Sequence, residues 1–381
     1  MNFKEKALRL HKKKKGKLEI KSKIKIKNKK HLALAYSPGV AQACLEIVDD
    51  KKNSYKYTAR RNLIAIVTDG TAVLGMGDIG AEAAMPVMEG KAILFKEFAN
   101  VDAIPICLDT KYVDEIVKTI KLLEPTFGGI NLEDISAPRC FEVEKRLKKE
   151  LNIPVFHDDQ HGTAIVVLAG LINSLKIVDK KIGEIKIVIS GAGAAGIAIT
   201  KLLLAYGAKN IIVCDSQGII HSERKLNKVK KELSKITNLE NMEGELKDAI
   251  KNTDVFVGVS KENVLKGEDV KSMNSNAIIF ALANPNPEIR PSVAKENGAQ
   301  IIATGRSDYY NQINNVLVFP GIFRGMLDYK IKNIDDKIKI AVAKAIAHSV
   351  KKLDKKHIIP DVFNKKVVKN IKEAMKEFGE E

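Results

Sequence analysis

The fold is restricted most by one run, residues 185–218, which reads IKIVISGAGAAGIAITKLLLAYGAKNIIVCDSQG. Its hydrophobic pattern predicts a buried strand, a glycine turn, a helix that ends at Gly207, and a second strand that ends at Asp215. A G-x-G-x-x-G pattern alone is weak evidence, but a strand before it, a helix after it and an acidic residue after the next strand make it specific. The run therefore predicts the first βαβ unit of a Rossmann-type sheet.

Each glycine of this turn has a predicted role in binding a dinucleotide. Gly191 makes the tight turn, Gly193 lets the backbone approach a pyrophosphate, and Gly196 lets the helix pack on the strand. The phosphates are expected at the helix N-terminus. The predicted cofactor-binding residues are Gly191, Ala192, Gly193, Ala194, Ala195 and Gly196, together with Asp215. The alternative is a Rossmann-like domain that binds no nucleotide, which is the less common case.

Asp215 is the predicted determinant of cofactor choice. Its carboxylate would accept hydrogen bonds from ribose hydroxyls and repel a 2′-phosphate, which favours NAD over NADP. Ser216 and Gln217 follow it and supply no arginine for a 2′-phosphate. Because lysines are frequent nearby, NADP remains an alternative cofactor.

The rest of the chain alternates short apolar runs with helical patterns, which predicts an α/β fold. Further strands are expected at 63–70, 101–109, 128–135 and 153–159 in the first half, and at 254–260, 277–284 and 299–304 in the second. Helices are expected at 82–99, 113–125, 138–151 and 160–178. We predict an N-terminal α/β substrate-, metal-binding and dimerisation domain at 1–159. A doubly wound dinucleotide-binding domain with C-terminal helices follows at 160–381.

The formal charge of +17 raises the alternative of a nucleic-acid-binding protein, with residues 11–31 as the most basic segment. Lysine outnumbers arginine by 55 to 9, however, and the lysines recur along the whole chain. Arginine forks and aromatic platforms, which read or stack on bases, are scarce. A solvated basic surface is the preferred interpretation, and it would attract a small dianionic substrate.

Targeting and redox signals are few. No apolar segment of a secretory signal is visible, and the longest nearly apolar run, residues 164–172, is too short to cross a bilayer. The four cysteines form no C-x-x-C pair. We expect a cytoplasmic protein with reduced thiols and no membrane partner.

The stretch HDDQHGTA at residues 157–164 admits two metal chemistries. His157 and His161 have the spacing of zinc ligands on a helix, whereas Asp158 and Asp159 are hard oxygen ligands. Because the aspartates end a short strand-like run, the histidines lose the helical geometry that their spacing suggests. A second acidic pair, Glu133 and Asp134, ends another such run. The two pairs favour a divalent cation over four solvated loop charges.

Tyr36 and Lys91 are the other candidates for chemistry. Tyr36 precedes the turn Ser37-Pro38-Gly39, which could hold a phenol rigidly in a cleft or leave it half-buried beside a turn. Lys91 is one of many lysines and would ordinarily lie at the surface. Burial and a neighbouring cation would lower its pKa, as a general base requires.

At the level of whole motifs the chain resembles malic enzymes, particularly the short bacterial and archaeal form. The resemblance runs from about His31 to about Gly325. It rests on motifs in the family's order, namely YSPGVA, VTDGTAVLGMGDIG, PVMEGKAILFK, INLEDISAPRCFEVE, FHDDQHGTA, GAGAAG, CDSQG, FALANPNPE and NNVLVFPG. The segment after Tyr329 matches only loosely.

The resemblance implies the oxidative decarboxylation of (S)-malate to pyruvate by a homodimer or larger homo-oligomer that uses NAD(P) and Mg²⁺ or Mn²⁺. It implies that such an enzyme also decarboxylates oxaloacetate. The roles that it implies are Tyr36 as general acid, Lys91 as general base assisted by Asp158, Glu133, Asp134 and Asp159 as metal ligands, and Asn284 and Asn315 as substrate contacts.

One departure and two rival functions remain. Longer family members carry an arginine shortly after TDG that contacts a substrate carboxylate, and Ala72 occupies that place here. One rival is another two-domain NAD(P)-dependent dehydrogenase, such as an amino-acid dehydrogenase, which would not need the two acidic pairs. The other rival is a dinucleotide-sensing nucleic-acid-binding protein.

Overall fold

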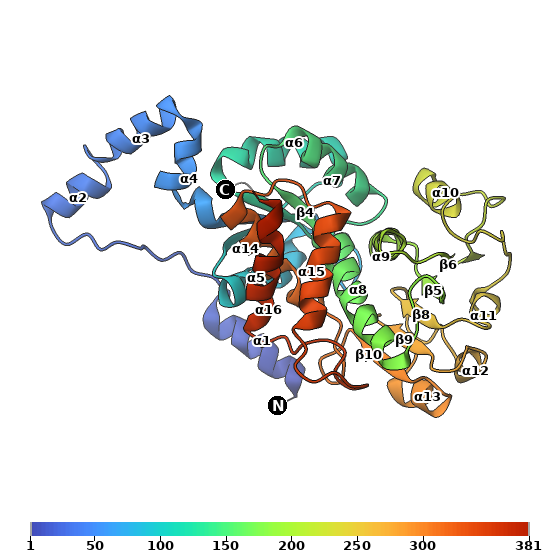
Figure 1. The fold of residues 1–381 in the computed structure, drawn as a ribbon. Helices are drawn as coiled ribbons and strands as arrows, with labels where there is room; N and C mark the ends of the chain where they lie inside the picture. The colour runs from blue at the N-terminus through green and yellow to red at the C-terminus, as the bar shows by residue number, and fades with distance from the viewer. Residues whose placement is uncertain (1, 380–381) are drawn as a thin grey trace.

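The computed structural model describes residues 2–379 and contains two mainly parallel sheets with helices packed around them (Figure 1). The first sheet has the order β2-β1-β3-β4, and all of its strands are parallel. Its strands are β1 (Leu63–Thr68), β2 (Asp102–Cys107), β3 (Gly129–Leu132) and β4 (Val155–His157). The helices that alternate with them are α5 (Ala81–Ala99), α6 (Val113–Leu123) and α7 (Arg139–Glu150).

The second sheet has the order β10-β9-β8-β5-β6-β7 and is the doubly wound sheet that the sequence predicts. Its strands are β5 (Lys186–Ser190), β6 (Asn210–Asp215), β7 (Gly218–Ile219), β8 (Val255–Gly258), β9 (Ile278–Ala281) and β10 (Ile301–Thr304). Its helices are α9 (Ala194–Ala205), α10 (Lys228–Ser234), α11 (Leu246–Ala249), α12 (Gly267–Lys271) and α13 (Pro291–Glu296). The two-residue strand β7, antiparallel to β6, is the member that the periodicity did not predict.

The central strands of both sheets are almost completely buried, which explains their continuous apolar runs. β8 and β9 are buried at every position, as is β1 after its first residue. A parallel strand covered on both faces needs apolar side chains at successive positions rather than at alternate ones. The strand order reverses beside β5, and this is where doubly wound sheets bind their ligands.

Helix α8 (Asp158–Val178) joins the two sheets and is the most deeply buried helix of the described chain. Of the described helices it alone has the length and apolar composition that could cross a membrane, and 78% of its most apolar window is buried inside the protein. The helix expected at 160–178 is present and begins two residues earlier, at Asp158. Its burial identifies it as a core helix.

The C-terminal helices pack on the first sheet's side of the molecule. They are α14 (Phe319–Tyr329), α15 (Asp336–His348) and α16 (Lys366–Met375). The ring of Phe95 on α5 lies 4.6 Å from that of Phe319 and 5.1 Å from that of Phe323, both on α14. Because α8 runs through residue 159 and α14 packs back on α5, the domain boundary at 159/160 stays a prediction.

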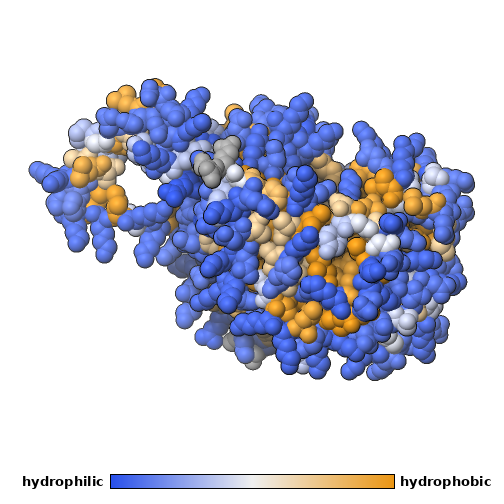
Figure 2. Space-filling view, in the orientation of Figure 1, coloured by the Kyte–Doolittle hydropathy of each residue, from blue (hydrophilic) through white to orange (hydrophobic). Residues whose placement is uncertain are grey.

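The N-terminal segment forms an arm that projects from the body (Figure 1). It contains α2 (Lys29–Ala35), α3 (Val40–Asp49) and α4 (Ser54–Tyr57), and none of these helices has a buried residue. The preceding helix α1 (Phe3–Lys14) lies beside the body, and Lys17 just after it donates to Pro86 O of α5 at 2.7 Å. Apolar side chains are exposed on the projecting arm (Figure 2), and the large ones are Leu18, Ile20, Ile24, Ile26, Leu32, Leu34, Tyr36, Val40, Leu45, Val48 and Tyr57.

Candidate active site

Lys91 is buried on α5 and is not the surface lysine that its sequence context would ordinarily predict. Only 7% of its surface is exposed. Its Nζ lies 2.5 Å from Glu133 Oε1 and 2.5 Å from Asp158 Oδ2, and 4.4 Å from the centre of the Phe319 ring. The amine is thus held between two carboxylates and an aromatic face.

The four predicted acidic residues meet at one edge of the first sheet. Glu133 and Asp134 follow β3, and Asp158 and Asp159 follow its parallel neighbour β4. Because the carboxyl ends of parallel strands share an edge, residues distant in the chain are brought together. One carboxylate oxygen each of Glu133, Asp134 and Asp159 lies within 4.8 Å of the others.

These carboxylates are buried close to one another, and both burial and mutual repulsion raise the pKa values of three of them. Burial, with Asp159 nearby, raises the pKa of Asp134 to about 8, and burial raises the pKa of Asp158 to about 6. Burial also raises the pKa of Glu133 well above its usual range. Burial opposes the charge on Lys91, but Asp158 and Glu133 outweigh it, so the pKa of Lys91 is raised. A cluster of this kind is relieved by a second positive charge.

The three clustered carboxylates fit a hard divalent cation. Asp159 stays ionised most readily, because the contact with His157 outweighs burial and lowers the pKa of Asp159. Asp134 has the left-handed φ of 53°, and its N–H donates to Asp159 Oδ2 at 2.8 Å, which ties the two acidic pairs together. An all-oxygen carboxylate donor set suits Mg²⁺ or Mn²⁺ rather than zinc.

The two histidines lie behind the carboxylates and face different partners. His157 is fully buried, with Nε2 3.3 Å from Asp159 Oδ2 and Nδ1 2.7 Å from Gln160 Nε2. His161 Nε2 lies 2.8 Å from Glu144 Oε1. The zinc arrangement suggested by their spacing is therefore absent from the described residues. Sequence reasoning missed Glu144, because nothing in the pattern distinguishes it from the other charges of α7.

The two predicted substrate residues lie at different places. Asn315 donates through Nδ2 to Asp158 Oδ2 at 2.6 Å and belongs to the cluster. Asn284 follows β9 and lines a cavity of about 860 Å³ together with Leu74, Met76 and Arg306. Asn284 therefore lies at an opening beside the loop that follows β1.

Tyr36 is not brought to Lys91 within one chain. It is the C-terminal cap of α2, it is 70% exposed, and it lies on the projecting arm (Figure 1). An acid that touches the substrate cannot act on this chain's own cluster from that position. Its predicted role as the acid therefore requires that Tyr36 reach the site of another copy of the chain.

An arginine lies close to the place of the missing family arginine. Arg139, at the start of α7, donates through Nη2 to Asp69 Oδ2 at 2.7 Å and to Thr71 Oγ1 at 2.8 Å. Thr71 immediately precedes Ala72, whose N–H donates to Asp134 O at 2.9 Å. A guanidinium is therefore present beside this loop, although it comes from a segment far along the chain.

The glycine turn has the shape that a dinucleotide requires. Gly191 has a φ of 118°, and a Cβ there would lie 2.6 Å from Val259 O. A Cβ at Gly196 would lie 1.7 Å from Gly191 O, whereas a Cβ at Gly193 would meet nothing within 4 Å. The outer two glycines are needed by the fold, and Gly193 leaves open space before the N-terminus of α9.

Asp215 ends β6 as predicted but is already paired with two cations. Arg224 Nη2 lies 2.9 Å from Oδ1, and Lys230 Nζ lies 2.7 Å from Oδ2. These contacts outweigh burial and lower the pKa of Asp215. Ser216 and Gln217 supply no arginine, but Arg224 contacts the carboxylate from further along the chain. Arg224 lies beyond a turn and a short strand, so its approach is set by tertiary packing.

Comparisons with known proteins agree with this arrangement. Residues 15–112 and 109–148 match "Malic enzyme, N-terminal domain", and residues 160–377 match "Malic enzyme, NAD binding domain". The NAD-dependent malic enzyme of Geobacillus stearothermophilus is 58% identical over 95% of this chain and 76% of that protein. The bifunctional malic/malolactic enzyme of Bacillus subtilis (strain 168) is 56% identical over 98% of this chain and 92% of that protein.

Solved structures give the same result for the fold. The NAD-dependent malic enzyme from Thermotoga maritima has a TM-score of 0.95 at 47% identity and covers 97% of this chain and 98% of that chain. The malic enzyme from Pyrococcus horikoshii has a TM-score of 0.94 at 45% identity, and the match covers 99% of this chain and 90% of that chain. The resemblance predicted from the ordered motifs is confirmed, and the chain belongs to the malic enzyme family.

Proposed function

We propose that this protein oxidises (S)-malate with NAD and releases carbon dioxide and pyruvate. The observation that carries the proposal is the buried amine of Lys91 between Glu133 and Asp158, beside three clustered carboxylates. This cluster lies at the carboxyl edge of the first sheet, and the second sheet supplies the dinucleotide turn. Membership of the malic enzyme family supports the same reaction. A nucleic-acid-binding role has no comparable support.

Glu133, Asp134 and Asp159 would hold the divalent cation. A Mg²⁺ or Mn²⁺ ion there would supply positive charge that polarises the C2 oxygen of the substrate and opposes protonation of Lys91. The raised pKa values of Glu133 and Asp134 support this assignment, because they report buried carboxylates that lie close to other carboxylates. Full turnover after complete removal of divalent cations would overturn it.

Lys91 is the proposed general base. In its neutral form the amine accepts the proton of the C2 hydroxyl while the C2 hydride passes to the nicotinamide. Asp158 holds Nζ in place and is itself held by Asn315, so the base is oriented by two further side chains. The resulting 2-oxo acid loses its C4 carboxylate as carbon dioxide, and the bond electrons remain in the C2–C3 enol. The same groups would decarboxylate added oxaloacetate.

Tyr36 is the proposed acid that protonates C3 of the enol, and it would act in a neighbouring copy of the chain. The arm that carries it has no buried residue in its helices and exposes a series of large apolar side chains. Such exposure is typical of a surface that is buried in an oligomer. We propose a homodimer, or a larger assembly of dimers, in which Tyr36 of the partner subunit completes each site.

NAD is the proposed preferred cofactor, with NADP as a weaker one. The negative charge of Asp215 disfavours a 2′-phosphate, whereas Arg224 and Lys230 beside it would partly offset that repulsion. Relatives with either preference exist, including NAD-dependent enzymes and the NADP-dependent malic enzyme of Escherichia coli (strain K12).

The test is an assay of purified protein with (S)-malate, NAD and Mn²⁺ that follows NADH by absorbance and the carbon products by NMR. The proposal expects equal amounts of NADH and pyruvate, and loss of both in Lys91→Ala. One relative is named a malic/malolactic enzyme. Formation of lactate without net NADH would therefore replace the proposed reaction by that second activity.

A separate assay isolates the proposed acid. Metal-dependent exchange of the pyruvate methyl protons with deuterated water requires protonation at C3 but no hydride transfer. Tyr36→Phe is expected to slow this exchange by about a hundredfold or more, the usual effect of removing a positioned acid. Exchange at the wild-type rate in Tyr36→Phe would require another acid.

A further inference from the structure

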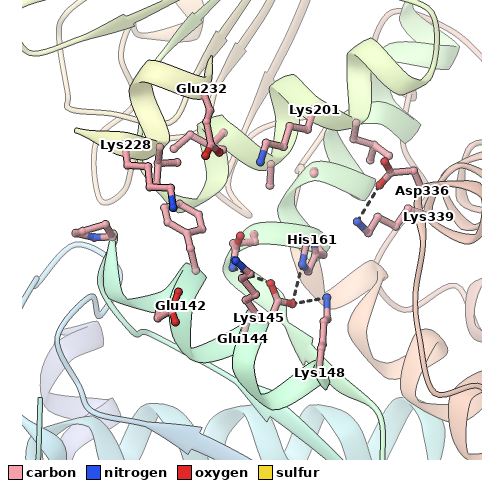
Figure 3. Close-up of a pocket in the computed structure, with 18 residues that line it drawn as sticks. Glu142, Glu144, Lys145, Lys148, His161, Lys201, Lys228, Glu232, Asp336 and Lys339 are labelled. Atoms are coloured by element: carbon pink, nitrogen blue, oxygen red, sulfur yellow. Dashed lines mark hydrogen bonds and ion pairs between the residues drawn. The ribbon is translucent and has the colours of Figure 1, made fainter. Parts of the chain in front are cut away.

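A crevice of about 500 Å³ is lined by residues of α7, α8, α9, α10 and α15 (Figure 3), and neither Lys91 nor Asp158 is among them. Neither the glycine turn at 191–196 nor the three cation-binding carboxylates line it. It runs instead along the later turns of α9, from Ile197 to Leu202. A ligand in this crevice would leave the nucleotide turn and the substrate cluster free.

The bottom of the crevice is apolar and its walls are charged. Its apolar lining comes mainly from Phe141, Ala164, Ile197, Ala198 and Leu202. Figure 2 shows hydrophobic side chains over α8 and α9 on this face, with hydrophilic side chains around them. A ligand that fits has a carbon skeleton as well as charged groups.

Three lysines from three different helices turn into the crevice without a carboxylate partner. They are Lys145 of α7, Lys201 of α9 and Lys228 of α10 (Figure 3). Within residues 2–379 no carboxylate oxygen lies within 4.0 Å of their amino groups, whereas Lys339 in the same wall is paired with Asp336 at 3.0 Å. Glu142 and Glu232 line the same crevice, and within residues 2–379 no Lys, Arg or His nitrogen lies within 4.0 Å of their carboxylates either, so the unpaired ammonium groups outnumber the unpaired carboxylates by three to two. An anion placed among the three lysines would gain from their charge.

The lysines also lie on both sides of the molecule's internal boundary. Lys145 belongs to a helix of the first sheet, and Lys201 and Lys228 belong to helices of the second. An anion that contacts all three would therefore link the two sheet layers. Occupancy can then affect how the layers sit around the active site.

The buried carboxylate of Glu144 also lines the crevice and accepts contacts from two helices. Lys148 Nζ lies 2.7 Å from Oε1, His161 Nε2 lies 2.8 Å from Oε1, and Gln160 Nε2 lies 3.2 Å from Oε2. Lys148, His161 and Gln160 also line the crevice. A ligand that contacts Lys148 or His161 would compete for the same carboxylate.

Glu144 is connected through Gln160 and His157 to Asp159, a proposed metal ligand. Gln160 contacts His157 Nδ1 at 2.7 Å, and His157 Nε2 lies 3.3 Å from Asp159 Oδ2. The His157 backbone N–H also donates to Glu144 Oε1 at 3.4 Å. Glu144, Gln160 and His157 are buried, which limits their alternative arrangements, whereas the Asp159 side chain is 30% exposed.

We propose that this crevice binds a small organic anion with two or more phosphate or carboxylate groups, and that its occupancy is coupled through Glu144 to the affinity of the cation site. Anion binding stands independently of the proposed function, whereas the coupling rests on it. The lysines and the apolar floor select the anion, and Gln160 and His157 carry the effect to Asp159.

Anion binding is tested by calorimetry without divalent cations and at constant ionic strength, with two probes. Fructose 1,6-bisphosphate supplies phosphates and tricarballylate supplies carboxylates, so the probe that binds identifies the anionic group. We expect saturable binding of one probe per chain that weakens by about tenfold or more in Lys145→Gln/Lys201→Gln/Lys228→Gln. The control Lys149→Gln/Lys209→Gln/Lys231→Gln removes three exposed lysines outside the crevice and should bind as wild type. Absence of binding by both probes, or equal loss in both triple variants, overturns the site.

The coupling is tested through Mn²⁺ affinity, measured from the electron paramagnetic resonance signal of free Mn²⁺. A saturating concentration of the binding probe should change this affinity several-fold in wild type, and Mn²⁺ should change the probe's affinity by the same factor. Glu144→Gln should abolish the change. Gln160→Met removes the contact between Gln160 and Glu144 but keeps the contacts of Glu144 with His161 and Lys148. It therefore tests the path through Gln160 alone. An unchanged Mn²⁺ affinity in wild type overturns the coupling, whereas absence of any Mn²⁺ binding would instead overturn the proposed function.

Discussion

Asp215 lies at the end of β6 with Arg224 and Lys230 on either side of its carboxylate. Asp215→Ala removes the negative charge and leaves both cations free, so the ratio of kcat/KM for NAD to that for NADP should fall by about tenfold. Arg224→Ala should move the ratio in the opposite direction, because a 2′-phosphate then loses a cation. Lys231 is an exposed lysine of α10, the helix that also carries Lys230, and Lys231→Ala serves as the control. An unchanged ratio in both Asp215→Ala and Arg224→Ala would place discrimination elsewhere.

The residue-scale electrostatics also predict a pH dependence. Burial raises the pKa of Asp134 from 3.8 to about 8, so this carboxyl is protonated at neutral pH in the cation-free protein. Because the folded state holds this proton between pH 3.8 and about 8 and the unfolded chain does not, the free energy of unfolding without cation should fall as pH rises across this range and level off above about 8. Mn²⁺ binding should release protons at pH 7, and the affinity should rise with pH. Calorimetry in two buffers of different ionisation enthalpy measures the release, which Asp134→Asn should reduce. Binding without proton release would contradict the assignment of Asp134 as a ligand.

At the scale of one element, the β5–α9 turn separates what the fold needs from what the nucleotide needs. In Gly196→Ala the new Cβ would lie 1.7 Å from Gly191 O, so we expect a loss of roughly 1–3 kcal/mol in stability. In Gly193→Ala the Cβ meets nothing within 4 Å, so the melting temperature should hardly change. The same methyl would stand where a pyrophosphate approaches, and the KM for NAD should rise by about tenfold. Thermal melts and NAD titrations of Gly193→Ala and Gly196→Ala test both expectations. An equal KM for NAD in wild type and Gly193→Ala would show that the pyrophosphate does not bind at this turn.

At the scale of the whole molecule, the exposed arm predicts that a single chain lacks a complete site. Lys91→Ala and Tyr36→Phe alone should each form pyruvate from malate about a hundredfold or more slower than wild type. When the two variants are mixed, unfolded and refolded together, half of the dimers combine one chain of each kind, and one of their two sites has both wild-type residues. Activity should then recover to about a quarter of wild type if the site is shared. No recovery, in a mixture shown by mass spectrometry to contain mixed dimers, would place Tyr36 in its own chain's site.

Much of the fold and part of the site follow from local patterns. The strand, turn and helix at 185–215 are recognisable because each glycine answers a constraint from residues close in the chain, such as Gly196 against Gly191 O. The two acidic pairs are recognisable because both directly follow buried strands, and parallel strands end at one edge. The two-residue strand β7 was not predicted, because so short a segment carries no period.

The sequence by itself therefore determined the two-sheet architecture, the dinucleotide turn, the acidic pairs and membership of the malic enzyme family. Only the tertiary structure decided that Lys91 is buried between carboxylates 42 and 67 positions away in the chain, and that Arg224 and Lys230 share Asp215. It also decided that Tyr36 lies exposed on the projecting arm and that Glu144 connects a lysine-lined crevice to Asp159. The physical reason is that periodicity and turn residues report interactions between neighbours in the chain. Burial and charge pairing depend instead on which distant surfaces pack together.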